Sequence, residues 1–201
     1  MVINADKEDG SLEIFTAEVR SIWGDGKDPE LPYKVKGLLE ELLTSTNPQE
    51  PWHANLIKEG LPSKELYRDK DHGFILMGHM HGKGHSNSPH DHGPCWVLYG
   101  VYHGAVEITT YRRTDDGKVP GRATLKRDEL RRLTRGIVVP YLPGEIHSTF
   151  AAEHSVVFRF LSHDLHKVKR YRYVCDGASF RVLTMTETSY DLFFSNETEK
   201  G

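Results

Sequence analysis

Residues 84–104 read GHSNSPHDHGPCWVLYGVYHG, and this stretch decides the fold. It holds a His-x-His pair, His90 and His92, directly before an apolar run that ends near a glycine. Alternate residues of a strand project from the same face, so the two imidazoles can point at one place while Asp91 faces away. Six of the twelve histidines lie between His72 and His92, and such local enrichment points first to a metal.

Composition narrows the function. The chain has 201 residues, enough for one domain, or one domain with an annex. Lys and Arg number 26 against 29 Asp and Glu, so the basic excess of a nucleic-acid binder is missing. No apolar run reaches the roughly 20 residues of a membrane span, and the first ten residues are polar and acidic. Two cysteines, Cys95 and Cys175, are too few for a disulfide framework, which fits a reducing cytoplasm. We therefore expect a cytoplasmic protein that binds neither nucleic acid nor membrane.

Hydrophobic periodicity divides the chain into a helical annex at 1–60, a β-barrel at 61–195 and a flexible tail at 196–201. Helices are predicted at 11–23 and 33–43, and a short helical turn at 128–133. Beyond Leu66, short runs of β-branched and aromatic residues alternate with turn residues, which is typical of an all-β sandwich or barrel. The predicted strands are 74–81, 95–102, 105–113, 123–126, 137–142, 148–150, 156–161, 171–174 and 180–185.

Two motifs resemble those of the cupin superfamily. The first is a glycine, five residues and His90-x-His92; the second is Gly136, seven residues, Gly144, two residues and His147. The resemblance covers about residues 66–185 and implies a double-stranded β-helix, or jelly-roll, barrel. In that family the two motifs bind one metal inside the barrel. The resemblance therefore implies that the metal ligands are His90, His92 and His147.

The glutamate usual in the first cupin motif is missing, because Trp96 or Val97 stands in its place. This departure makes the chain resemble the three-histidine cupins of the cysteine dioxygenase type. That resemblance implies a mononuclear non-heme Fe(II) dioxygenase, which inserts O2 into a small anionic chelating substrate such as a thiol carboxylate and yields a sulfinic acid. Imidazole ligands also suit Zn and Ni. Whether the protein is a monomer or a homodimer stays open.

Further candidate catalytic residues are Arg68, Tyr99 and Glu145. Arg68 stands where thiol dioxygenases carry an arginine that binds the substrate carboxylate, although a surface salt bridge is an equal alternative. Tyr99 and Trp96 differ by an odd number of residues, so only one of them can face the ligands. Glu145 stands two residues before His147 and can point the same way, as an acceptor or a fourth ligand.

Other features leave alternatives open. The Ser-x-His-x-Tyr relay of the thiol dioxygenases is absent, since its positions hold Phe158, Phe160 and Ser162. Cys95 can be a buried hydrophobe or face the interior. The histidines at 79, 81 and 85 are interpreted as a polar face in preference to a second metal site. The rival functions are a zinc-dependent or other metal-dependent hydrolase or isomerase, and a non-catalytic cupin that binds a small ligand.

Overall fold

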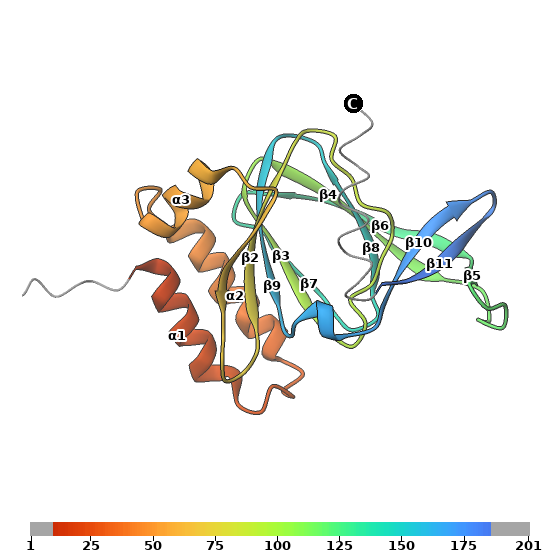
Figure 1. Ribbon diagram of the computed structural model, residues 1–201, viewed down its shortest axis with the longest axis horizontal. Coiled ribbons are helices and arrows are strands. Elements are labelled where there is room, and N and C mark those ends of the chain that lie inside the picture. Colours follow the sequence, from red (N-terminus) through yellow and green to blue (C-terminus); the bar gives the residue numbers. More distant parts are fainter. Residues whose placement is uncertain (1–9, 186–201) are drawn as a thin grey trace, which may run out of the picture.

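The computed structural model describes residues 10–185 and consists of a β-barrel with helices on one side (Figure 1). The tail predicted at 196–201 and the last residues of the predicted barrel range lie outside the described residues. Three helices come first in the chain, and the third was not predicted individually: α1 (Ser11–Trp23), α2 (Leu31–Ser45) and α3 (Pro51–Glu59).

Eleven strands follow within the described residues, and all of their pairings are antiparallel. They are β1 (Ser63–Arg68), β2 (Ile75–His81), β3 (Val97–His103), β4 (Ala105–Arg113), β5 (Arg122–Ala123), β6 (Leu125–Thr134), β7 (Val138–Tyr141), β8 (Ile146–Ala151), β9 (Ser155–Leu161), β10 (Arg170–Asp176) and β11 (Ser179–Met185). The helical turn predicted at 128–133 is wrong, because this segment is part of β6 and pairs along β4. Partner-strand hydrogen bonds override weak local helix propensity there.

The barrel has two layers. One is a five-stranded sheet in the order β1-β2-β9-β3-β7, and the other is a three-stranded sheet in the order β6-β4-β8. Their inner faces share one buried cluster, to which Ile75, Val97, Val101, Val157 and Leu161 come from the first sheet. Val106, Ile108 and Leu133 come from the second. The predicted all-β barrel with an N-terminal helical annex is thereby confirmed.

The helices cover the outer face of the five-stranded sheet (Figure 1). Trp96 and Leu98 of the β3 segment and Phe158 and Phe160 of β9 pack there against apolar side chains of α1 and α2. This sheet is therefore buried on both faces, which explains why β3 is apolar at nearly every position. The prediction that only one of Trp96 and Tyr99 faces inward is confirmed, because Trp96 lies under the helices.

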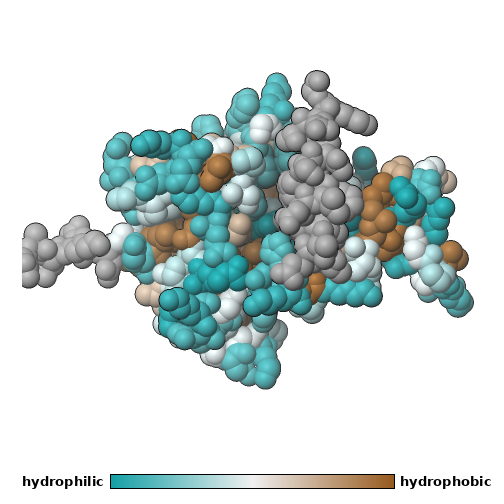
Figure 2. Space-filling model, viewed as in Figure 1, coloured by the Kyte–Doolittle hydropathy of each residue, from teal (hydrophilic) through white to brown (hydrophobic). Residues whose placement is uncertain are grey.

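A third sheet, in the order β10-β11-β5, forms an arm that extends from the barrel on the side away from the helices (Figure 1). Ala123 of β5 and Tyr173 of β10 form a small buried cluster with Ile146 of β8. The visible surface of the molecule is largely hydrophilic, with apolar side chains gathered near the arm (Figure 2). Among residues 10–185, no helix is both long enough and apolar enough to cross a membrane.

Close contact between helix and sheet predicts the effect of Gly100→Ala. A Cβ at Gly100 would lie 2.6 Å from Leu43 Cδ1 and 3.0 Å from Val138 Cγ2. Overpacking of this kind costs about 1–3 kcal/mol, and we expect the urea midpoint to fall accordingly. The control is Gly37→Ala, at an exposed position of α2. A Cβ there would have nothing within 4 Å, and helix propensity favours Ala by up to ~1 kcal/mol. Equal stability of both variants would contradict the contact.

Candidate functional site

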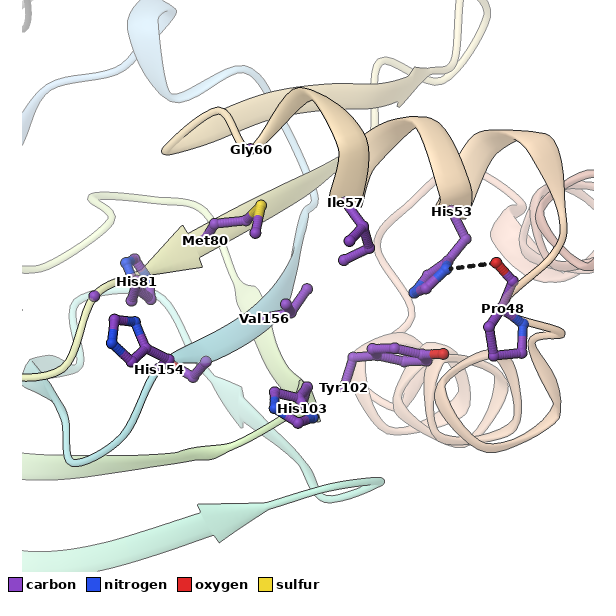
Figure 3. A pocket seen from close by; sticks show the side chains of 12 residues that line it. Pro48, His53, Ile57, Gly60, Met80, His81, Tyr102, His103, His154 and Val156 are labelled. Carbon is purple, nitrogen blue, oxygen red and sulfur yellow. Dashed lines mark hydrogen bonds between the residues drawn. The ribbon is translucent and has the colours of Figure 1, made fainter.

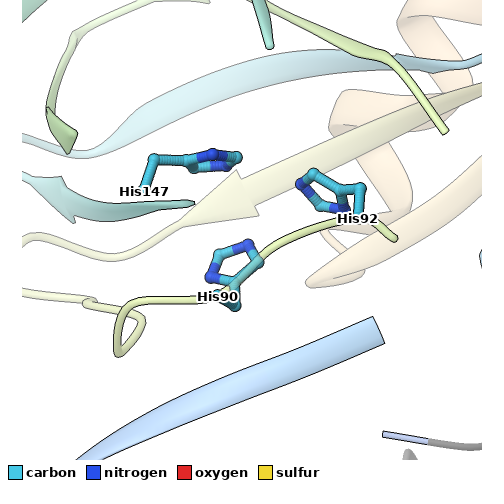
Figure 4. A group of neighbouring side chains, drawn as sticks. All are labelled: His90, His92 and His147. Carbon is cyan, nitrogen blue, oxygen red and sulfur yellow. The ribbon is translucent and has the colours of Figure 1, made fainter. Parts of the chain in front are cut away.

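Three histidines meet inside the barrel. His90 and His147 form a backbone pair, in which His90 N donates to His147 O at 2.9 Å and His147 N donates to His90 O at 3.0 Å. One potential ligand atom from each of His90, His92 and His147 lies within 4.8 Å of the other two, and all three rings are buried. Figure 4 shows the rings turned toward a common centre from two distant segments. The structure therefore brings these three histidines together, as the sequence predicted.

The nitrogens of these rings fit a metal. Nδ1 of His90 lies 2.9 Å from the carbonyl of Ser88, which assigns the proton to Nδ1 and leaves Nε2 as a lone-pair donor. Both ring nitrogens of His92 and of His147 are buried without a hydrogen-bond partner among residues 10–185. Buried polar atoms are normally satisfied, so an ion between the rings is the fitting partner for one nitrogen of each.

Burial keeps the imidazoles neutral. It lowers the pKa of His90 to about 4 and the pKa values of His92 and His147 well below the ordinary value. Neutral imidazole is the form that binds metal, so these side chains are ready for an ion at neutral pH without losing a proton. These three histidines, called the triad below, form a group of possible metal ligands that includes no carboxylate, and Glu145 is not part of it. An Fe(II) or Zn ion held by it would keep its full charge.

Two tyrosines flank the triad on the side of the five-stranded sheet. The ring centroid of Tyr99 lies 5.4 Å from that of His147 and 6.3 Å from that of His92. Tyr141 stacks on His147 at 4.1 Å, and its buried hydroxyl has no hydrogen-bond partner among the described residues. Tyr99 thus lies beside the candidate ligands, and Tyr141 restricts the orientation of the His147 ring.

One functional candidate was missed in the sequence. Arg159 of β9 is paired directly with Tyr99 of β3 and with Met77 of β2, both of which contribute to the inner cluster. Directly paired residues project from the same face of a sheet, so Arg159 faces the barrel interior. Its charge also contributes to the lowered pKa values of all three histidines. The signal in the sequence is that Arg159 is the single charged residue in the otherwise largely apolar run 155–161.

Arg68 and Glu145 have other partners. The Arg68 guanidinium bonds Glu65 at 2.7 Å and Asp164 at 2.8 Å, and its side chain is 40% exposed. These two ion pairs correspond to the surface salt bridge that the sequence left open as an alternative. The exposed carboxylate of Glu145 accepts a hydrogen bond from Leu142 N at 2.7 Å within its own turn. The Glu145 carboxylate therefore bonds to the backbone of its own turn and is not grouped with the three histidines.

Three more histidines stack on one another at the end of β2 and in the loop that follows it. His79, His81 and His85 form a parallel stack with centroid separations of 5.8 and 4.6 Å, and they do not form a three-ligand group. His81 also lines a pocket of about 570 Å³ between α3 and the barrel, together with His53 and His154 (Figure 3). Cys95 is a free, buried thiol of the inner cluster.

Fold and site together define an antiparallel β-barrel with three histidines that can hold a metal ion. No protein-family model matches the chain, and no curated protein matches it in sequence. Among solved structures it is similar to KdgF from a Halomonas species, with 20% identity, 49% of this chain and 76% of that chain covered, and a TM-score of 0.38.

Two further solved structures are similar. A cupin superfamily protein from Desulfitobacterium hafniense has 17% identity, covers 51% of this chain and 76% of its own, and gives a TM-score of 0.39. The DMSP lyase DddQ from Ruegeria pomeroyi has 16% identity, and the match covers 54% of this chain and 49% of that chain with a TM-score of 0.40. At these values the likeness says nothing about the reaction of this chain.

The geometry predicts that His147→Ala removes metal retention. After anaerobic loading with Fe(II) and gel filtration, we expect the variant to hold almost no iron by elemental analysis, because two imidazoles remain of three. Circular dichroism should show the fold retained. His154→Ala, which changes an exposed histidine in the turn before β9, is the control and should retain iron like the unaltered protein. Stoichiometric iron in His147→Ala would exclude His147 as a ligand.

Proposed function

We propose that the protein is a mononuclear non-heme Fe(II) dioxygenase for a small thiol carboxylate. The overall reaction is R–SH + O2 → R–SO2H, in which the sulfur is oxidised by four electrons and both oxygen atoms end on it. The ligands are His90, His92 and His147. When bound, the iron supplies the redox chemistry that allows O2 to react with the substrate.

The observation that carries this proposal is a neutral three-histidine group with no carboxylate in it. An Fe(II) ion bound there keeps a charge of +2, which favours an anionic chelating substrate such as a thiolate. Three cations also act on the site, because Arg159, Arg170 and Arg172 all contribute to lowering the pKa of His90. The site is therefore suited to attract and neutralise an anion.

In this proposal the side chains of the barrel orient the substrate and exclude water. Arg159 holds the substrate carboxylate, since a guanidinium offers two parallel donors to a carboxylate. Tyr99 contributes a phenol on the same inner face as Arg159, directly across the strand pair. The apolar inner cluster around Val97, Val101 and Leu161 keeps the interior dry, which strengthens these polar contacts.

Oxygen uptake tests the reaction. We expect the Fe(II)-loaded protein to consume O2 with a thiol carboxylate, such as cysteine or 3-mercaptopropionate, and to form the sulfinic acid detected by NMR. Cysteamine and a β-diketone serve as comparison substrates, because cysteamine lacks the carboxylate and the diketone lacks the thiol. Zinc at full occupancy in anaerobically purified protein, with no O2 uptake after iron is added, would favour the hydrolase or isomerase alternative.

Substitution of Arg159 tests the orientation of the substrate. Loss of a hydrogen bond to a charged group costs about 1.5–3 kcal/mol, so Arg159→Gln should raise KM for a thiol carboxylate by roughly 10- to 150-fold. The KM of Arg159→Lys should lie between that of the unaltered protein and that of Arg159→Gln. The matched control is Arg68→Gln, whose exposed ion pairs predict little change. A raised KM in Arg68→Gln with no change in Arg159→Gln would reverse the assignment.

A further inference from the structure

Two of the three candidate ligands lie on a segment outside the regular strands. Residues 89–93 run between β8 and the arm strand β10. On the β8 side, His90 pairs with His147. On the arm side, Asp91 N donates to Tyr171 O at 3.0 Å and Tyr173 N donates to Pro89 O at 2.8 Å. The arm thus forms one wall of the segment that carries His90 and His92.

Asp91, between the two ligands, bonds this segment to the arm. Its side chain is buried, with the residue 4% exposed. Oδ1 accepts hydrogen bonds from Gly93 N at 2.9 Å and from Tyr171 N at 3.1 Å, and Oδ2 accepts one from the Tyr173 hydroxyl at 3.3 Å. One carboxylate therefore joins the turn after His92 to two residues of β10.

The local packing leaves this segment little freedom. Gly93 has a φ of +60°, and a Cβ there would lie 2.2 Å from the carbonyl oxygen of Lys169, just before β10. The backbone after His92 is therefore pressed against the start of the arm. Because Asp91 is adjacent to both ligands and points away from them, a shift of its carboxylate moves both imidazoles.

We infer that Asp91 is a positioning residue, which fixes His90 and His92 for the metal by bonding their segment to the arm. It does not contact the metal. Groups that orient metal ligands typically change affinity by about 10- to 100-fold when they are removed. The inference rests on the metal centre of the proposed function but not on its oxygen chemistry, so absence of O2 uptake would leave it intact.

Asp69 provides a matched control. It is 2% exposed and accepts hydrogen bonds from the backbone N of Asp71 and His72 and from the Tyr67 hydroxyl, at 3.0, 2.7 and 3.1 Å. It also forms an ion pair with Arg20 of α1 at 2.9 Å. This carboxylate has the same burial and the same kinds of donor as Asp91 but holds the loop between β1 and β2. Asp69→Ala therefore reports what the loss of a buried structural carboxylate does by itself.

The test is Co(II) binding to the full chain, followed by visible absorption and by competition with a chelator. We expect Asp91→Ala to raise the Co(II) dissociation constant by roughly 10- to 100-fold and to alter the absorption bands. Asp69→Ala should lower the melting temperature but keep the affinity and bands of the unaltered protein. Asp91→Asn retains one acceptor oxygen and should rescue part of the affinity.

Wild-type affinity and bands in Asp91→Ala would overturn the inference, as would an equal loss of affinity in Asp69→Ala. If Asp91→Ala does not fold, Tyr173→Phe decides, because it removes only the bond to Oδ2. We then expect a several-fold weaker Co(II) affinity with altered bands, and unchanged values would overturn the inference. Absence of Co(II) binding by the unaltered protein would remove the metal centre and the inference together.

Discussion

The two backbone hydrogen bonds between His90 and His147 are the constraint on which the site depends. They join a segment outside the regular strands to β8, which is itself held by β4 through the pairing of His147 with Thr110. Side chains of directly paired residues lie side by side, so this one pair brings the two motifs of the chain into contact. Pairing of residues 89–93 with β8 and assembly of the three histidines are therefore one event.

The helical annex supports the site from the other side of the five-stranded sheet. The inner face of β3 and β9 carries Tyr99 and Arg159, and their outer face is apolar and needs cover. The helices approach so closely that glycine stands at positions 78 and 100, where a Cβ would lie under 3.0 Å from a leucine side chain. The ion pair of Arg20 with the buried Asp69 attaches α1 to the sheet. Helix packing thus fixes the strands whose opposite face lines the site.

The three converging histidines could be predicted from the sequence because their spacing is local to two motifs, and strand alternation showed that only one of Tyr99 and Trp96 could face them. Arg68, Arg159 and β6 show where such reasoning ends. The role of Arg68 was open because its partner Asp164 is remote in the sequence. Arg159 was missed because the inward face of β9 depends on its register with β2 and β3. The segment 128–133 has a polar, helix-compatible composition, and only its pairing with β4 makes it a strand.

The charges around the triad explain why the missing glutamate matters. A carboxylate ligand would offset part of the charge of a bound divalent ion, and a nearby guanidinium would then have less field to reinforce. Here the ligands are neutral, and Arg159 adds a positive charge on the same inner face. Burial in an apolar barrel weakens solvent screening, so ion and guanidinium act together on any anion that enters. The proposed substrate, an anion with a thiolate for the metal and a carboxylate for Arg159, matches this arrangement of positive charge.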